Sequence, residues 1–148
     1  MIAKMPSDPT TDAWIALVRA QQKVLGAVEA DLKASGFPPL AWYDILLELR
    51  RARPDGLRPM DFEPRLLLAQ HNVSRLLDRL EKASLIRREV HKRDGRGQQI
   101  HITDAGLELQ QRMWPVYGAA IERHVGSKLA GDGDAGDLAG LLGKLLAD

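Results

Sequence analysis

The stretch Leu85-Ile-Arg-Arg-Glu-Val-His-Lys-Arg-Asp-Gly-Arg-Gly-Gln-Gln-Ile-His-Ile-Thr103 decides the fold of this chain. Two segments rich in β-branched and long side chains, Leu85–Arg93 and Gln98–Thr103, flank Asp94-Gly-Arg-Gly97, and glycines at such a point are typical of a tight turn. In the second segment the isoleucines alternate with polar residues, as the two faces of a strand require. The stretch therefore predicts a basic β-hairpin with an arginine at its tip.

A helix is predicted directly before this hairpin, over Ala69–Ala83. Its apolar residues recur at helical spacing and would form an inner face. A polar helix followed by a basic hairpin is the arrangement with which a winged helix-turn-helix holds DNA, the helix in the major groove and the hairpin tip in the minor groove. The polar residues on or near its outer face are Gln70, His71, Asn72, Ser74, Arg75 and Arg79.

The distribution of charge supports a nucleic-acid surface in the middle of the chain. The net charge of the 148 residues is only +1. The segment Arg50–Thr103, however, holds 13 Lys and Arg against 7 Asp and Glu, a net charge of +6, and the remainder is −5. A basic middle between acidic ends favours nucleic-acid binding by the middle and another task for the ends.

Composition narrows the class of protein. With 45% hydrophobic residues the chain can build a core, and its length suits one domain. It contains no cysteine, which excludes disulfides, thiolate zinc sites and cysteine nucleophiles. Neither a signal-peptide core nor an apolar run of membrane-spanning length is present, so we predict a cytoplasmic location.

The rest of the chain is predicted to be helical. Pro59 and Pro64 make the segment Arg58–Leu67 a short or broken helix. Thr103 is expected to cap a long helix that Pro115 kinks. The leucine-rich side of the last helix is too apolar to be left in water, so the terminal helices are expected to meet a second copy. The remaining predicted elements are helices over Asp12–Ser35, Leu40–Arg53, Asp104–Leu129 and Asp137–Ala147, with a flexible break at Gly131–Asp134.

This order of elements, mainly α with a small β-hairpin wing, resembles the MarR family of bacterial transcription regulators. Leu57–Glu81 runs without a gap against the family's two DNA-binding helices and ends in Val73-Ser-Arg-Leu-Leu-Asp-Arg-Leu-Glu81. The wing Asp94-x-Arg96 and the following Ile102-Thr-Asp-Ala-Gly106 are also similar to family motifs.

The resemblance implies one domain over residues 1–148, with dimerisation helices at 12–36 and 104–147 and a winged-helix DNA-binding lobe at 40–103. It further implies an obligate homodimer on double-stranded DNA with a pseudo-palindromic operator, released by a ligand. The chain departs from the family pattern at several positions: Ala69 stands where Ser or Thr often caps the recognition helix, Leu67 and Ser84 stand where Gly is common, and Pro59 and Pro64 are unusual.

Individual DNA contacts are assigned by residue chemistry. Arg96 is predicted to enter the minor groove, the alternative being a solvated arginine in a tight turn. Asp94 would be repelled by phosphate, so it is expected to hold the wing backbone or to orient Arg96. Arg75 and Asn72 are the favoured base-reading residues, although any polar residue of the helix could touch only phosphate. Phosphate contacts or solvated strand residues are predicted at Arg87, Arg88, Lys92 and Arg93.

The aromatic residues suggest a second candidate site. They could line a pocket for a small aromatic effector, but core packing is the simpler account for most of them. The candidate pocket residues are Trp14, Trp42, Tyr43, Arg112, Met113, Trp114 and Tyr117.

No cofactor, metal site or enzymatic activity is predicted. Asp132-x-Asp134-x-x-Asp137 fails as a calcium loop because its twelfth position is Gly143 rather than Glu. No nucleophile, base and acid converge in the sequence. The leading hypothesis is a homodimeric, sequence-specific DNA-binding transcription regulator, a repressor released by a small-molecule effector. The alternative is a winged-helix module that binds a protein partner without specific DNA binding.

Overall fold

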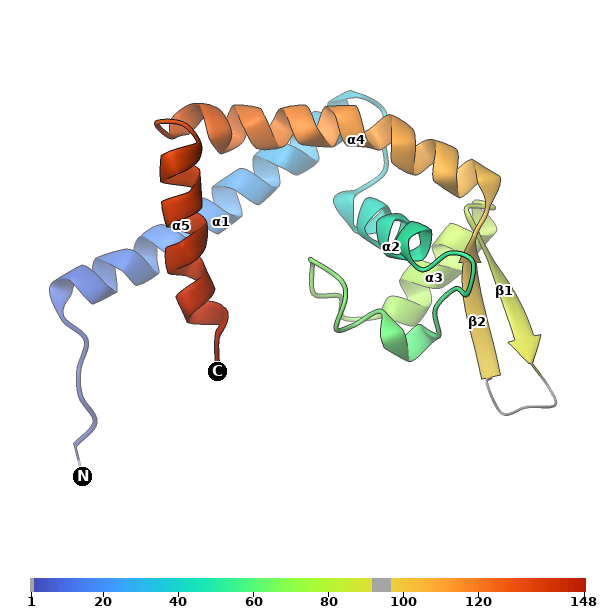
Figure 1. Cartoon of the computed structure of the whole chain (residues 1–148), viewed down its shortest axis with the longest axis horizontal. Coiled ribbons are helices and arrows are strands. Elements are labelled where there is room, and N and C mark those ends of the chain that lie inside the picture. The colour runs from blue at the N-terminus through green and yellow to red at the C-terminus, as the bar shows by residue number, and fades with distance from the viewer. Residues whose placement is uncertain (1, 92–96) are drawn as a thin grey trace. The chain divides into compact units, whose positions relative to one another are not determined.

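A computed structural model describes residues 2–91 and 97–148 as a mainly helical fold with a two-stranded antiparallel hairpin, which confirms the predicted fold class (Figure 1). Contacts divide the chain into two compact units, one formed by residues 32–116 and the other by residues 1–31 and 117–148. The elements are α1 (Asp8–Ala34), α2 (Leu40–Arg51), the 3-10 helix η1 (Pro59–Asp61), α3 (Val73–Lys82), β1 (Ile86–His91), β2 (Gly97–Ile102), α4 (Asp104–His124), η2 (Gly126–Lys128) and α5 (Asp132–Leu146).

The central unit has one hydrophobic core, contributed by α2, η1, α3 and the hairpin. Phe62, which follows η1, is fully buried in it, as are Leu80 of α3 and Ile100 of β2. These side chains come from elements that are each too short to be stable alone, so their burial together is what holds the unit.

The segment between α2 and α3 is a short helix, as its two prolines predict. Only Pro59–Asp61 is helical, with Pro59 at the first helical position, where its missing N–H costs nothing. The carboxylate of Asp61 accepts a hydrogen bond from the backbone N–H of Arg58 at 2.9 Å and so caps the turn. The chain then runs irregularly to α3.

The hairpin is joined by a third short extended segment. Leu57 and Ile100 exchange backbone hydrogen bonds of 3.0 Å and 2.7 Å in an antiparallel bridge. Gly56, just before it, has φ +75°, and a Cβ there would lie 2.5 Å from the carbonyl oxygen of Ile100. The sequence Pro54-Asp-Gly56 therefore ends α2 and brings the chain against β2, which needs glycine for both conformation and space.

Helix α1 begins four residues before its predicted start at Asp12. The hydroxyl of Ser7 accepts a hydrogen bond from the backbone N–H of Thr10 at 3.3 Å, so Ser7 caps the first turn. At the other end Gly36 has φ +78°, which ends the helix as predicted.

Helix α4 ends at His124, and the residues predicted to continue it to Leu129 form η2 instead. Its start is as predicted: the hydroxyl of Thr103 accepts a hydrogen bond from the backbone N–H of Gly106 at 3.1 Å. Pro115 lies inside α4, and the helix is not interrupted there.

The prediction of a flexible break at Gly131–Asp134 is wrong, because α5 begins at Asp132. Only Gly131, with φ +90°, lies outside the helix. The carboxylate of Asp134 accepts a hydrogen bond from the backbone N–H of Ala130 at 2.9 Å. Acidic residues in the first turn are also stabilised by the positive end of the helix dipole. The stretch that the sequence predicts to be a linker is therefore the start of a helix.

Among the described helices, none is both long and apolar enough to span a membrane.

Candidate nucleic-acid interface

Helix α3 is short and strongly two-sided. Leu76, Leu77 and Leu80 are buried on one side, and Ser74, Arg75 and Arg79 are exposed on the other. The amide oxygen of Asn72 accepts a hydrogen bond from the backbone N–H of Arg75 at 2.9 Å, so Asn72 is the N-cap. Asparagine is among the best capping residues, and this bond fixes where the helix begins.

The predicted helix start at Ala69 is therefore wrong, and the capping position is Asn72 rather than Ala69. Residues 69–71 are not helical. The carboxylate of Asp44, a buried residue of α2, accepts a hydrogen bond from the backbone N–H of Leu68 at 3.0 Å, which holds the chain in an irregular path before α3. Gln70 is half-buried and lines a hollow of about 310 Å³ with Leu67 and neighbouring residues, whereas His71 is exposed.

The two strands pair in the register Ile86 with Ile102 through His91 with Gly97. Directly paired residues share one face of a hairpin. Arg88 pairs with buried Ile100 and thus lies on the inner face, whereas Arg87 pairs with His101 on the other face. The two adjacent arginines consequently differ: 58% of the Arg87 side chain is exposed and 20% of that of Arg88.

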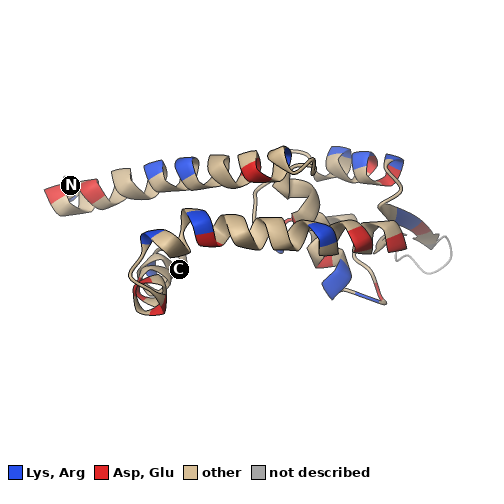
Figure 2. Ribbon diagram, turned by 90° about the horizontal axis from the view of Figure 1, so that it is seen from above, with Lys and Arg blue, Asp and Glu red and all other residues tan. Residues whose placement is uncertain are grey.

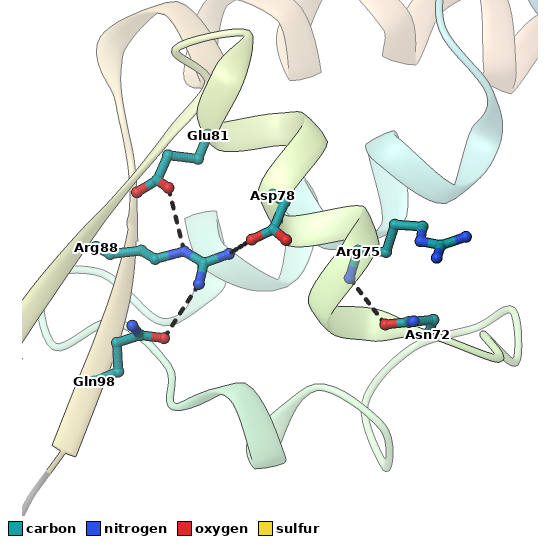
Figure 3. A network of polar contacts seen from close by, with 6 residues as sticks. All are labelled: Asn72, Arg75, Asp78, Glu81, Arg88 and Gln98. Carbon is teal, nitrogen blue, oxygen red and sulfur yellow. Dashed lines mark hydrogen bonds and ion pairs between the residues drawn. The ribbon is translucent and has the colours of Figure 1, made fainter.

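Arg88 bridges three elements, as Figure 3 shows. Its Nη2 lies 2.5 Å from a carboxylate oxygen of Asp78, and its Nε lies 3.5 Å from one of Glu81, both on α3. Its Nη1 donates a hydrogen bond of 3.4 Å to Gln98 on β2. In the same view the guanidinium of Arg75 points away from this network.

Charges alternate closely along α3. Figure 2 marks basic and acidic residues side by side on this helix, which carries three basic and two acidic residues. The sequence-based site left out the two acidic ones, Asp78 and Glu81. A sequence signal for this contact exists. Arg88 is two residues from Ile86, so strand alternation puts both on the face that turns to α3, where Arg88 meets the two carboxylates.

Four of the residues assigned to the DNA-binding site by the sequence lie outside the described residues. They are Lys92, Arg93, Asp94 and Arg96.

The predicted effector residues fall into both units. In the central unit the rings of Tyr43 and Trp114 stack with centroids 6.5 Å apart, and the guanidinium of Arg112 lies 5.6 Å from the ring centre of Phe37. Tyr43 is buried, and 50% of Trp114 is exposed. Met113 is fully buried and Trp42 packs against the core, which is the core role the sequence left open for them. Trp14 and Tyr117 belong to the other unit.

Sequence reasoning missed a buried polar contact next to this stack. Gln110 of α4 is buried, accepts a hydrogen bond of 2.6 Å from Nη1 of Arg50, and donates one of 3.3 Å to the hydroxyl of Tyr43. A glutamine three residues before Met113 lies on the same side of a helix, and that spacing is the signal that could have revealed it.

In the part of the chain that the structure describes, no three His, Asp or Glu side chains gather in a way that could hold a metal ion.

Comparison with known sequences points to one family. A family model described as the MarR family matches residues 35–97. An uncharacterized HTH-type transcriptional regulator, YkoM of Bacillus subtilis strain 168, is 34% identical over 94 residues, which are 63% of this chain and 58% of that protein. An uncharacterized HTH-type transcriptional regulator of Bacillus cereus is 33% identical over 75 residues, 51% of this chain and 48% of its own length. The matches thus span about half the length of these curated relatives.

Solved structures extend the likeness to nearly the whole chain. AbsC, a MarR family transcriptional regulator from Streptomyces coelicolor, is 26% identical with a TM-score of 0.83, over 97% of this chain and 96% of its own. Sco3205, a MarR family regulator of the same organism solved in complex with DNA, shares the fold with a TM-score of 0.85 at 21% identity, over 98% of this chain and 90% of its own.

Proposed function

Because this chain belongs to the MarR family of transcriptional regulators, we propose that it is a homodimeric, sequence-specific DNA-binding repressor released by a small-molecule effector. Its membership of a family of regulators also confirms the prediction that it is not an enzyme.

The exposed face of α3 is the observation that carries DNA binding. Arg75 and Arg79 project from a helix whose other face is fixed in the core, so their guanidinium groups are held on a rigid support. Guanidinium groups recognise guanine edges and phosphates. We propose that α3 enters the major groove and that the hairpin lies along the adjacent backbone. DNA binding as such is supported by the Streptomyces coelicolor neighbour of the same fold, which was solved in complex with DNA.

The N-cap hydrogen bond of Asn72 distinguishes the two favoured base-reading residues, Arg75 and Asn72. Reading adenine with both of its edge groups requires the amide oxygen and the amide nitrogen of an asparagine. The oxygen of Asn72 already caps α3. We therefore propose Arg75 as the main base-reading residue and assign Asn72 to the start of the helix.

A second copy is proposed to cover α5. Leu138, Leu141 and Leu145 recur on one side of this helix and are 41%, 61% and 67% exposed, and no residue of α5 is buried. Apolar side chains at this spacing gain free energy when they are removed from water. A dimer would also place two copies of α3 on half-sites about one helical turn apart.

The proposed effector site is the stacked pair Tyr43 and Trp114. The ring of an aromatic acid could stack on the exposed part of Trp114. Release of DNA by such a ligand, together with the blocking of a promoter by the bound dimer, would make the protein a repressor. Titration with aromatic acids should quench Trp114 fluorescence and lower DNA affinity together. Quenching without a change in DNA affinity would contradict the effector role.

The test of DNA binding is the selection of bound fragments from sheared genomic DNA. An enriched inverted repeat with half-sites about one helical turn apart is the expected result. With that repeat as probe, Arg75→Ala should lower affinity by about tenfold, which corresponds to the loss of one base contact. Lys4→Ala, an exposed residue before α1, is the control and should leave affinity unchanged. No enrichment at low salt by a verified dimer would overturn the proposal and favour a protein partner instead.

A separate prediction concerns Arg96. Arg96→Ala should weaken binding and relax the preference for A·T pairs flanking the half-sites, because arginine is attracted to narrow minor grooves. The measurement is a competition between operators with A·T and G·C flanks. If affinity and flank preference are unchanged, Arg96 does not enter the groove.

A further inference from the structure

We propose that Arg88 is a positioning residue, which fixes the strands β1 and β2 to α3 and neutralises two carboxylates of that helix, and that it does not contact phosphate. This inference rests on the proposed function of DNA binding and assigns one basic residue of that surface a different task.

The contacts of Arg88 carry the positioning role. Its guanidinium reaches Asp78 and Glu81 on α3 and Gln98 on β2 from a backbone position on β1 (Figure 3). One side chain therefore joins the helix to both strands. Only 20% of the side chain is exposed, and its Nε finds no hydrogen-bond acceptor among the described residues, so Glu81 acts on it through charge alone.

The carboxylates explain why a cation is needed here. Asp78 and Glu81 are 67% and 45% exposed, on the same helix as Arg75. Two carboxylates on a helix that approaches DNA are repelled by phosphate, and this repulsion is strong at low salt. The Arg88 guanidinium lies between them and offsets their charge, which leaves the basic residues of α3 to attract the DNA.

Arg87 is a natural control because it is the adjacent residue with the same side chain on the opposite face. It is 58% exposed, and its Nη1 lies 3.8 Å from a carboxylate oxygen of Glu89. A guanidinium held this loosely can turn to a phosphate at little cost. Replacing Arg87 and replacing Arg88 should therefore change DNA binding in different ways.

The first experiment compares Arg88→Gln with Arg87→Gln in operator titrations over a range of salt. Arg87→Gln should reduce the salt slope by about one and weaken operator and shuffled DNA equally. Arg88→Gln should keep the salt slope but reduce the preference for the operator by about tenfold, because a displaced helix reads bases less well. A reduced slope with unchanged preference in Arg88→Gln would overturn the proposal.

The second experiment removes the carboxylates. The double substitution Asp78→Asn and Glu81→Gln should raise DNA affinity about fivefold more in the Arg88→Gln background than in the wild type, as expected for residues that interact directly. Equal gains in both backgrounds would contradict charge neutralisation. Should Arg88→Gln fail to fold, Arg88→Met, which also removes the charge and keeps a long side chain, takes its place.

A measurement without DNA separates this inference from the proposed function. Amide hydrogen exchange of the free protein should rise in β1 and β2 in Arg88→Gln and stay unchanged in Arg87→Gln. Unchanged exchange in both variants would overturn the positioning role. If the wild type binds no DNA but exchange rises as expected, the proposed function fails and the structural link stands.

Discussion

Helix α3 is more polar than α5, and yet it is α3 that buries its leucines. α3 carries five charged residues in ten and buries three leucines. α5 has five leucines in fifteen residues and buries none of them. Burial therefore depends on what the rest of the chain places against a helix and not on how apolar the helix is. The leucines of α3 meet the core of the central unit, whereas those of α5 are not buried, which is why a second copy is proposed to cover them.

The largest effect is expected in the core beneath α3. Leu80→Ala should lower the free energy of unfolding by about 3 kcal/mol, because Leu80 is fully buried and its loss leaves a cavity. Urea denaturation monitored by circular dichroism measures this change. A loss below about 1 kcal/mol would mean that the core of the central unit adapts and that the contrast with α5 is weaker than its burial indicates.

A smaller effect is expected where the hairpin meets α4. The hydroxyl of Thr103 accepts a hydrogen bond from the N–H of Gly106 and donates one of 2.8 Å to the carbonyl of Ser84. Thr103→Val keeps the shape and removes both bonds, so we expect a loss of about 1 kcal/mol in the same denaturation. Thr10→Val, which removes one exposed hydroxyl contact of 3.0 Å with Ser7, is a control for the change of residue type. Equal losses in the two variants would argue against a special role for Thr103.

A pH-dependent effect is expected in the terminal unit. Asp31 lies 2.8 Å from Nε2 of His124 and 2.7 Å from Nη1 of Arg123. The hydrogen bond from His124, followed by the charge of Arg123, holds the pKa of the Asp31 carboxyl below its ordinary value. Its stabilising effect is therefore present above the ordinary aspartate pKa of about 3.9 and is lost as the pH falls through the lowered value.

Asp31→Asn should consequently melt at a lower temperature than the wild type at about pH 5, and the difference should shrink toward about pH 3. Differential scanning calorimetry across this range gives the measurement. A difference that stays constant with pH would show that the charge of Asp31 contributes nothing.

The smallest effect on the folded monomer is expected on α5. Leu141→Ser should change the unfolding free energy in dilute solution by no more than about 0.5 kcal/mol, because the side chain is 61% exposed. At higher concentration the same variant should shift the protein from dimer to monomer in sedimentation velocity. A dimer that persists would exclude α5 from the interface.

Much of the fold was predictable because its signals are local. The hairpin follows from glycines between alternating segments, the α4 cap from Thr103, and the short η1 from Pro59 and Pro64. The start of α3 was not predictable from periodicity, since Ala69 to His71 fit a helical pattern equally well. The N-cap bond of Asn72 and the hold of Asp44 on Leu68 decided it, and the second joins residues 24 apart in sequence.

The sequence by itself determined the fold class, the order of elements and the basic middle that favours DNA, because periodicity, turn chemistry and charge are properties of neighbouring residues. Only the tertiary structure decided which of two adjacent arginines is held and which is exposed. Arg87 and Arg88 have identical side chains, and they differ because the pairing of β1 with β2 turns Arg88 toward Asp78 and Glu81 on α3.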